Sequence, residues 1–332
     1  MRERESTQLS FADTVVAQLG GKRTQALLDQ LNAAIDWESL ARPIRAVYRN
    51  DDGGSPAEPV VMMVKILMLQ KWFNLSDPQA EEQLNDRVSF RRFVGLRGGD
   101  AAPDETTLVV FRRRLREADL DRKLFDIVKR LIEERGLLVK EGTLVDALIL
   151  EAPTGRKTGK SEGKASAKDE AGNDITTRDK DASFTKKHGR TYHGYKGHVA
   201  ADQSGIVTDF EFSTASHHDS RYIDGLTKKE KRAVIADAAY SDQERRRRLE
   251  KRKVTDGIAY KRHRGQKELS PSTKKLNRVI ASIRAAVEHT MARLRKWGAM
   301  RTRYRGERRN RFDFALTLVA HNLRRAMWLA SP

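Results

Sequence analysis

The chain has 332 residues, no cysteine, and 65 lysines and arginines against 46 acids, which gives a formal net charge of +19. The lack of cysteine excludes disulfides, thiolate zinc sites and cysteine nucleophiles. So large a basic excess favours a polyanionic partner, nucleic acid first, over a surface that is merely soluble and basic.

No segment of the sequence predicts a membrane protein. The first residues, MRERESTQLS, lack the apolar core of a signal peptide. The most apolar segment, 60–69, is interrupted by Lys65 and is too short to span a bilayer. We therefore expect a cytoplasmic, nucleoid-associated protein.

The first third of the chain has helical spacing throughout. Apolar residues recur at helical intervals within residues 8–48, and a linker composition, DDGGSPAEP, follows at 51–59. A helix is predicted over 60–73. Ser76-Asp77-Pro78 is a start signal for a second helix, which should run to about Phe93 and end at Gly95.

A further helix follows the GGDAAPDETT break and carries a cluster of arginines. Two short helices with Arg112, Arg113 and Arg116 on the second are compatible with a DNA-binding helix-turn-helix. An ordinary bundle with a solvated basic face explains the pattern equally well. A last helix, about 120–135, should end at Gly136. Residues 1–138 thus form the predicted helical N-terminal DNA-binding domain.

The pattern changes to strands after Leu137. GLLVKEGTLVDALILEAP is rich in leucine and β-branched residues, which favours a buried strand. Asp146 lies in its middle, with Leu144 and Leu148 as alternate neighbours. An acid on the apolar face of a strand is costly unless it is paired or binds a metal, so a functional role is favoured over a solvated one.

The remaining chain predicts a mixed sheet with helices. Residues 153–190 are rich in lysine, glycine and aspartate, which predicts a flexible basic loop. Two antiparallel strands should then flank a turn at 202–205. Alternating helices and strands follow, with a strand ending at Asp237 and a long helix over 272–298. This order predicts an α/β fold, a ribonuclease H-like mixed sheet with flanking helices, over residues 139–332.

Three acids stand at unusual places in this predicted domain. Asp146 is on the first strand, and Asp237 ends the strand KRAVIADAAY, where open α/β sheets place their chemistry. Glu288 lies on the long helix beside an apolar stripe, with Arg284 four residues before it. A capping acid and a surface Arg–Glu pair are the plainer interpretations of Asp237 and Glu288.

Taken together, the three acids predict a metal centre. Carboxylates that converge at one end of a sheet repel one another unless cations lie between them. Hard oxygen ligands suit Mg²⁺ or Mn²⁺, and two such ions can stabilise the attacking and leaving oxygens of a phosphoryl displacement. The basic charge of the chain is consistent with a phosphate backbone as substrate.

The chain resembles the DDE transposases of bacterial insertion sequences, in the family numbered five within the four-type group. The matching pieces are LVDALILEAP, TKKHGRTYHGYKGHVAAD, VIADAAYSD and RAAVEHTMARLRKWGAMRTRYRG, and in the helical part VMMVKILMLQKW and PDETTLVVFRRRL. The four-type group has a tyrosine, arginine, glutamate and lysine pattern on the last helix. Arg284 and Glu288 match it, whereas Ala281 replaces the tyrosine and Arg295, beside Lys296, replaces the lysine.

This resemblance implies an Mg²⁺-dependent DNA transposase in which Asp146, Asp237 and Glu288 hold two ions. Such an enzyme cuts at the terminal inverted repeats and joins the 3′ ends to target DNA, and because it must bring two ends together it should act as a homodimer or larger. The alternatives are a metal-dependent nuclease of the same fold and a DNA-binding protein of transposon origin. Whether His217, His218 or Asp219 take part is left open, and a helix-opening cap is the favoured role of Asp219.

DNA contacts are expected from basic residues in three regions, with the arginine-dense segment after Glu288 favoured as a backbone-binding surface over a solvated face. They are Arg284, Arg295, Lys296, Arg301, Arg303, Arg305, Arg112, Arg113, Arg116, Lys186, Lys187 and Lys196.

Overall fold

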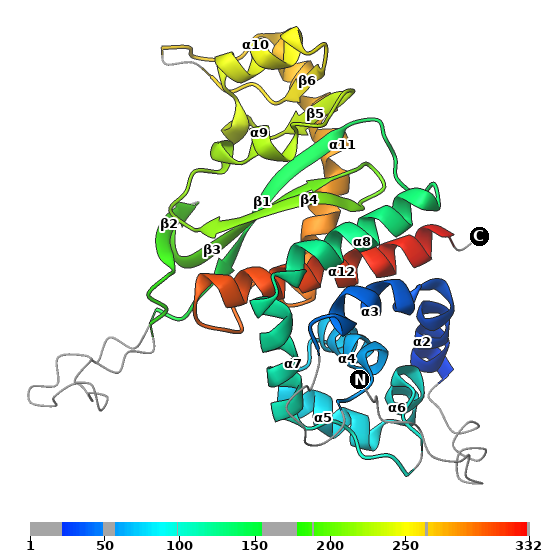
Figure 1. Ribbon diagram of the computed structural model, residues 1–332. Helices are drawn as coiled ribbons and strands as arrows, with labels where there is room; N and C mark the ends of the chain where they lie inside the picture. The colour runs from blue at the N-terminus through cyan, green and yellow to red at the C-terminus, as the bar shows by residue number, and fades with distance from the viewer. Residues whose placement is uncertain are drawn as a thin grey trace, which may run out of the picture. The chain divides into compact units, whose positions relative to one another are not determined.

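The computed structural model describes residues 22–48, 57–97, 99–154, 178–187, 189–262 and 265–330 (Figure 1). The chain forms two compact units, Met1–Leu138 with Ala315–Pro332, and Val139–Phe314. The change of unit at residue 138 is the one that the sequence suggests. The final residues from Ala315, however, group with the first unit and not with the second.

The first unit is helical wherever it is described. Its helices are α2 (Lys22–Ala34), α3 (Trp37–Arg45), α4 (Val60–Phe73), α5 (Asp77–Asp86), α6 (Val88–Val94), α7 (Glu105–Glu117), α8 (Leu120–Glu134) and the part of α12 (Glu307–Ala330) from Ala315 onward. The predicted helical segment before Lys22 and most of the predicted linker at 51–59 lie outside the described residues.

Helix α4 is the centre of this unit because it is apolar on every side and almost entirely buried. The Trp72 indole N–H donates to the Ala320 carbonyl at 2.9 Å. Lys65 is buried as well, and its ammonium lies 5.5 Å from the Trp37 ring centroid. The desolvated charge is therefore held over an aromatic face, and burial lowers the pKa of Lys65.

The start signal at Ser76 is confirmed, whereas the single helix expected after it is divided. Ser76 forms a capping box with Gln79, and Pro78 lies in the first turn of α5. Arg87 is extended, with φ −101° and ψ 109°, so α5 and α6 are separate helices. Asn85 and Asp86 precede this break, and such side chains compete for the backbone and disfavour helix continuation.

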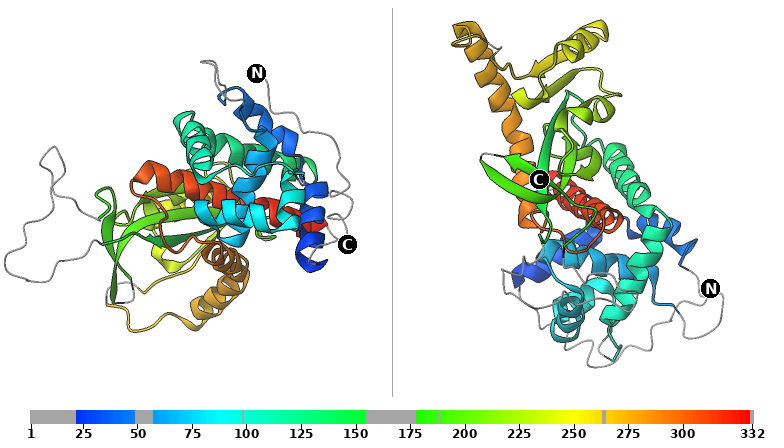
Figure 2. Two further views of the ribbon diagram at one scale, coloured as in Figure 1. Left: turned by 90° about the horizontal axis from the view of Figure 1, so that it is seen from below. Right: turned by 90° about the vertical axis from the view of Figure 1, so that its left-hand side faces the viewer.

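The second unit is built on a mixed six-stranded sheet (Figure 2). Its strands are β1 (Thr143–Glu151), β2 (Ser183–Lys187), β3 (Arg190–Ala201), β4 (Val207–Thr214), β5 (Ala233–Ala236) and β6 (Thr255–Ile258). The order is β2-β3-β1-β5-β6, and β4 also pairs with β3. Strand β2 lies in the segment that the sequence predicts to be a flexible loop, and it pairs with the first half of β3.

The helical elements of this unit follow the strands in the predicted order. They are the 3₁₀ turn η1 (Asp219–Arg221), α9 (Ile223–Leu226), the 3₁₀ turn η2 (Ala238–Tyr240), α10 (Gln243–Lys251), α11 (Pro271–Lys296) and the first residues of α12. Figure 1 shows α11 running behind the strands, and it packs against β1 and β5. A mixed sheet with flanking helices, preceded by a helical region, confirms the predicted ribonuclease H-like fold class.

Both faces of the sheet are covered, which explains why β1 is apolar on both sides. One face packs Val145 and Ala200 with Ile223, Tyr240 and other residues of the helical segments. On the other face the ring of Phe314 packs against Phe212 at a centroid distance of 5.6 Å.

The long helix is confirmed, but only half of its predicted apolar stripe is buried. Ser270 caps α11 and Pro271 occupies its first turn. Ile280, Val287, Met291 and Leu294 are buried, as the spacing predicts, whereas Leu276, Val279 and Ile283 are exposed. The helix therefore packs against the sheet mainly through its C-terminal half.

The described part of the chain contains no helix that is both long and apolar enough to cross a bilayer.

The close approach of β3 to Phe314 generates a stability prediction. A Cβ at Gly197 would lie 2.3 Å from Cζ of Phe314, so Gly197→Ala should overpack this face and destabilise the fold by about 1–3 kcal/mol. Urea unfolding followed by circular dichroism measures the loss. The double variant Gly197→Ala/Phe314→Leu should recover part of it, and strictly additive losses would contradict the proposed clash.

Candidate functional site

The pairing of β1 with β5 brings two of the three predicted acids together. The strands are parallel, and their last register pair is Leu144 with Ile235. Asp146 and Asp237 each come two residues after that pair in the same direction. Continued past that pair, the register would bring Asp237, which directly follows β5, opposite Asp146, and the Asp237 charge acts on Asp146.

Asp146 is in an environment that disfavours its negative charge. Burial raises the pKa of this carboxyl, and the nearby Asp237 charge adds to the effect. The Ala147 amide, Arg284 and Lys187 act in the opposite direction, and that amide donates to Oδ1 of Asp146 at 2.9 Å. Burial is the largest of these effects, and a cation bound at Asp146 would offset it.

Asp237 is held by the short turn that follows β5. Its Oδ1 accepts from the Ala239 amide at 2.7 Å, so the side chain caps η2. The plain capping role considered from the sequence is therefore real, and it leaves the second carboxylate oxygen, Oδ2, for another partner. One carboxylate can serve both functions.

Glu288 is on α11, but it does not complete a three-acid cluster. Its side chain is 56% exposed, and Oε1 lies 3.8 Å from Nη2 of Arg284. Arg284 is only 15% exposed and also acts on Asp146. Across the described ranges, no three His, Cys, Asp or Glu side chains lie close enough to hold a metal ion. Arg284 therefore counters the charges of both Asp146 and Glu288.

A fourth acid, Asp219, approaches the same region. Its Oδ1 lies 2.9 Å from Nζ of Lys196, which also donates to the His217 carbonyl at 2.8 Å. The predicted helix cap at this position is not Asp219 but His218, whose side chain accepts from the Ser220 amide. Asp219 is thus free of a capping role and is paired with a lysine of β3.

Two predicted DNA-binding residues have partners inside their own units. The Arg112 guanidinium is buried, donates to Asp77 at 2.6 Å and to Gln70 at 3.1 Å, and so joins α4, α5 and α7. Lys196 is buried against Asp219, as described above. A buried, paired cation cannot reach a phosphate without breaking its ion pair, so these two residues are structural and we no longer expect them to bind DNA.

The other predicted DNA-binding residues are at least partly accessible. Exposed ones are Arg113, Lys186, Lys187, Arg295, Lys296, Arg301 and Arg305, and half-buried ones are Arg116, Arg284 and Arg303.

Tyr240 is a site residue that the sequence does not reveal. It is buried and ends the turn that Asp237 caps. Among the residues described, its hydroxyl has no hydrogen-bond partner, and neither does Nε of Arg284. Burial raises the pKa of Tyr240, with further contributions from Asp219, Asp146 and Asp237. The charges of these three carboxylates therefore all act on one buried hydroxyl. An aromatic residue three positions after a strand-ending acid was the only available signal.

Two family models and several solved structures are similar to this chain. A family model described as "Transposase DDE domain" matches residues 138–323, more than half of the chain, and one described as "Transposase domain (DUF772)" matches residues 19–114. Among solved structures, the piggyBac transposase synaptic complex with hairpin DNA is 12% identical, with 92% of this chain and 73% of that chain covered and a TM-score of 0.43. The Mos1 strand transfer complex is 11% identical, with 77% and 83% covered and a TM-score of 0.20. These structural likenesses are weak, and the family models carry the comparison.

A buried histidine beside the site predicts a specific pH dependence. His198 is 1% exposed, stacks on Tyr222 at 4.1 Å, and contacts Ser213 at 3.0 Å. Burial lowers the pKa of His198 to about 4 from its usual 6.5, with Lys196 and His217 adding to the effect and Asp219 opposing it. Between pH 6.5 and about 4, His198 is therefore protonated in the unfolded chain and neutral in the folded chain.

Stability from this residue should be complete above pH 6.5 and should fall by up to about 3 kcal/mol as the pH drops towards 4. Urea midpoints between pH 7 and pH 4.5 measure the decline. His198→Gln, which cannot be protonated, should flatten it in this window. An unchanged slope in the variant would show that other groups cause the acid sensitivity.

Proposed function

The chain belongs to the family of transposases with a DDE domain, and from this premise we propose that it mobilises a bacterial insertion sequence of the family numbered five. It binds the terminal inverted repeats, cleaves phosphodiester bonds at the ends and joins the 3′ ends to target DNA. The placement of Asp146 beside Asp237 by the parallel β1–β5 pairing is the observation that carries the proposal.

The residues present are suited to a divalent cation. Two carboxylates whose charges act on one another, one of them made costly by burial, provide hard oxygen ligands. We assign Asp146, Asp237 and Glu288 as the residues that hold Mg²⁺ or Mn²⁺, two ions to a site. When bound, the metal supplies Lewis-acid activation of water and stabilisation of the leaving oxygen.

Arg284 is the residue that links Glu288 to the other two acids. It counters the charge of Asp146 and lies 3.8 Å from Glu288, while its Nε has no partner among the described residues. A buried guanidinium N–H without an acceptor is well suited to a phosphate oxygen. Arg284 therefore orients the scissile phosphate, and the exposed Glu288 carboxylate turns towards the site when the acids bind their cations.

The basic residues after α11 and on β2 bind the DNA backbone. Arg295, Lys296 and Arg301 are exposed where the polypeptide leaves α11, and Lys186 and Lys187 are exposed on β2. Lys187 also counters the charge of Asp146, so its strand reaches the site. Such contacts position the duplex without reading its sequence. In the first unit, Arg113 and Arg116 on α7 are the remaining candidates for end recognition.

The reaction requires more than one copy of the chain. Two transposon ends must be brought together before joining, so we assign a homodimer or larger assembly on DNA, acting in the cytoplasm at the nucleoid.

Removal of a site carboxylate should abolish chemistry and leave DNA binding. Asp237→Asn and Glu288→Gln should each lower cleavage of an inverted-repeat duplex by at least about 100-fold, since even residues that only support metal ligands cost up to that much. Gel-shift affinity should remain within a few-fold. Normal cleavage by Glu288→Gln would remove this residue from the site. Cleavage without joined products in the wild type would favour a nuclease.

Binding of DNA should weaken steeply with salt. The slope of log affinity against log salt should become less negative by up to about 3 when Arg295, Lys296 and Arg301 are all replaced by Gln, because each phosphate contact contributes roughly 0.9. Fluorescence anisotropy between 50 and 200 mM salt, about the range in which such effects are measured, tests this. Arg122→Gln/Arg130→Gln on α8, where both arginines pair with neighbouring acids, is the control. An equal change in the control would contradict the assigned surface.

A further inference from the structure

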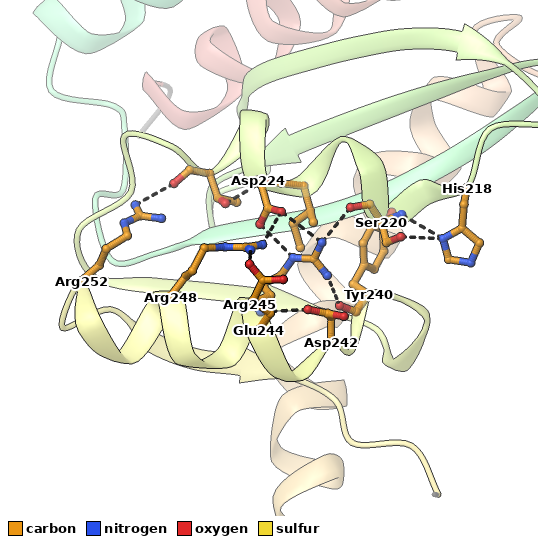
Figure 3. Close-up of polar contacts among 11 residues, drawn as sticks. His218, Ser220, Asp224, Tyr240, Asp242, Glu244, Arg245, Arg248 and Arg252 are labelled. Atoms are coloured by element: carbon orange, nitrogen blue, oxygen red, sulfur yellow. Dashed lines mark hydrogen bonds and ion pairs between the residues drawn. The ribbon is translucent and has the colours of Figure 1, made fainter. Parts of the chain in front are cut away.

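A single buried arginine on α10 joins the two turns that carry Asp237 and Asp219. Arg245 is 6% exposed, and its own amide donates to Asp242, the cap of α10, at 2.9 Å. Its guanidinium donates to the Tyr240 carbonyl at 2.6 Å and the Ser220 carbonyl at 2.8 Å (Figure 3). It also forms a bidentate pair with Asp224 at 2.9 and 3.2 Å.

The two carbonyls belong to the three-residue 3₁₀ turns η2 and η1. Tyr240 is the last residue of η2, the turn that Asp237 opens and caps. Ser220 is in η1, directly after Asp219, whose carboxylate reaches Lys196. Arg245 thus holds η2 at the end opposite Asp237, and it holds η1 at the residue that follows Asp219.

Arg248 on α10 and Arg252, the C-cap of that helix, make structural contacts of their own, but neither binds the carbonyls of Tyr240 and Ser220. Arg248 pairs with the same Asp224 at 2.8 Å and with Glu244 at 2.8 Å. Arg252 donates to the carbonyls of Thr227, Lys228 and Glu230. Without Arg245, Arg248 would therefore still neutralise Asp224, and Arg252 would still connect α10 to the loop before β5. Its own contribution is the link between the acid-bearing turns.

We propose that Arg245 is a positioning residue that holds the Asp237 and Asp219 carboxylates towards Asp146, and this rests on the proposed function of Asp237 as a metal ligand. Charged donors to carbonyl groups are stronger than neutral ones and, once buried, restrict both partners. In this proposal Asp219 is a further acid near the three assigned ones, and its carboxylate is held by Lys196 as well as by the turn that Arg245 anchors. The charges of Asp219, Asp146 and Asp237 all act on the buried Tyr240 hydroxyl, which is consistent with this arrangement.

The test compares four single variants of the full chain, with Asp237→Asn as a reference. Arg245→Ala removes all the guanidinium contacts, and Arg245→Lys keeps the charge but cannot reach both carbonyls and Asp224 together. Arg248→Ala and Arg252→Ala are matched controls on the same helix. Three quantities are measured: the urea midpoint, Mn²⁺ affinity from electron paramagnetic resonance of free Mn²⁺, and the Mg²⁺ concentration for half-maximal cleavage of an inverted-repeat duplex.

Both Arg245 variants should weaken Mn²⁺ binding and raise the Mg²⁺ requirement by roughly 10- to 100-fold, as expected for a residue behind metal ligands. Arg248→Ala and Arg252→Ala should stay within about threefold, even where Arg252→Ala lowers the urea midpoint. If Arg245→Ala does not fold, Arg245→Lys carries the comparison. A folded Arg245→Lys with wild-type Mn²⁺ affinity would overturn the inference, as would equal metal effects in Arg252→Ala.

The reference variant separates this inference from the proposed function. If Asp237→Asn abolishes Mn²⁺ binding and cleavage while the Arg245 variants behave as wild type, only the positioning role is lost. If Asp237→Asn itself leaves metal binding and cleavage unchanged, the assignment of Asp237 fails, and the positioning role fails with it.

Discussion

The parallel pairing of β1 with β5 is the constraint on which the rest of the site depends. Its register brings Asp146 and Asp237 together although 90 residues of chain lie between them in the sequence. The pairing is possible because helices and loops cover both faces of these strands, which lets β1 remain apolar on both sides. The same burial makes the Asp146 charge expensive, and the proposed cation would offset that cost.

Some cations of this unit face the acids directly, whereas others support the backbone that carries them. Arg284 counters Asp146 directly and pairs with Glu288. Lys196 pairs with Asp219, and Arg245 holds the backbone of the turns and touches none of the assigned acids. A chain with a formal charge of +19 thus uses some of its arginines and lysines as internal supports, and only the exposed remainder can meet a polyanion. Net charge indicates the class of partner, whereas burial decides which cations are available to it.

In the proposed site, Glu288 stands apart from the other two acids as long as no cation is bound. Two acids are fixed by strand pairing and a capped turn, and the third is on an exposed helical surface beside an arginine. Bringing three charged carboxylates together without cations would cost electrostatic energy. An accessible third acid avoids that cost until cations and phosphate arrive. The N-terminal half of α11, with Leu276, Val279 and Ile283 exposed, is less tightly packed than the half that follows Glu288.

Periodicity and local residue chemistry alone determined much of this protein: the helical first unit, the change to strands after residue 138, the Ser76 and Gly95 helix boundaries, and the order of strands and helices that defines the fold class. These properties depend on short-range spacing, which a sequence shows directly. The oddness of Asp146 was visible for the same reason, since its alternate neighbours are leucines.

Only the tertiary structure decided which charges meet. The pairing of β2 within a segment of loop-like composition, the burial of Arg112 and Lys196, and the Arg245 links all join residues far apart in the chain. Composition cannot distinguish an arginine that faces solvent from one that binds carbonyl groups inside the fold, because both are equally basic. That distinction depends on packing, which also buried Tyr240 where the charges of Asp219, Asp146 and Asp237 act on it.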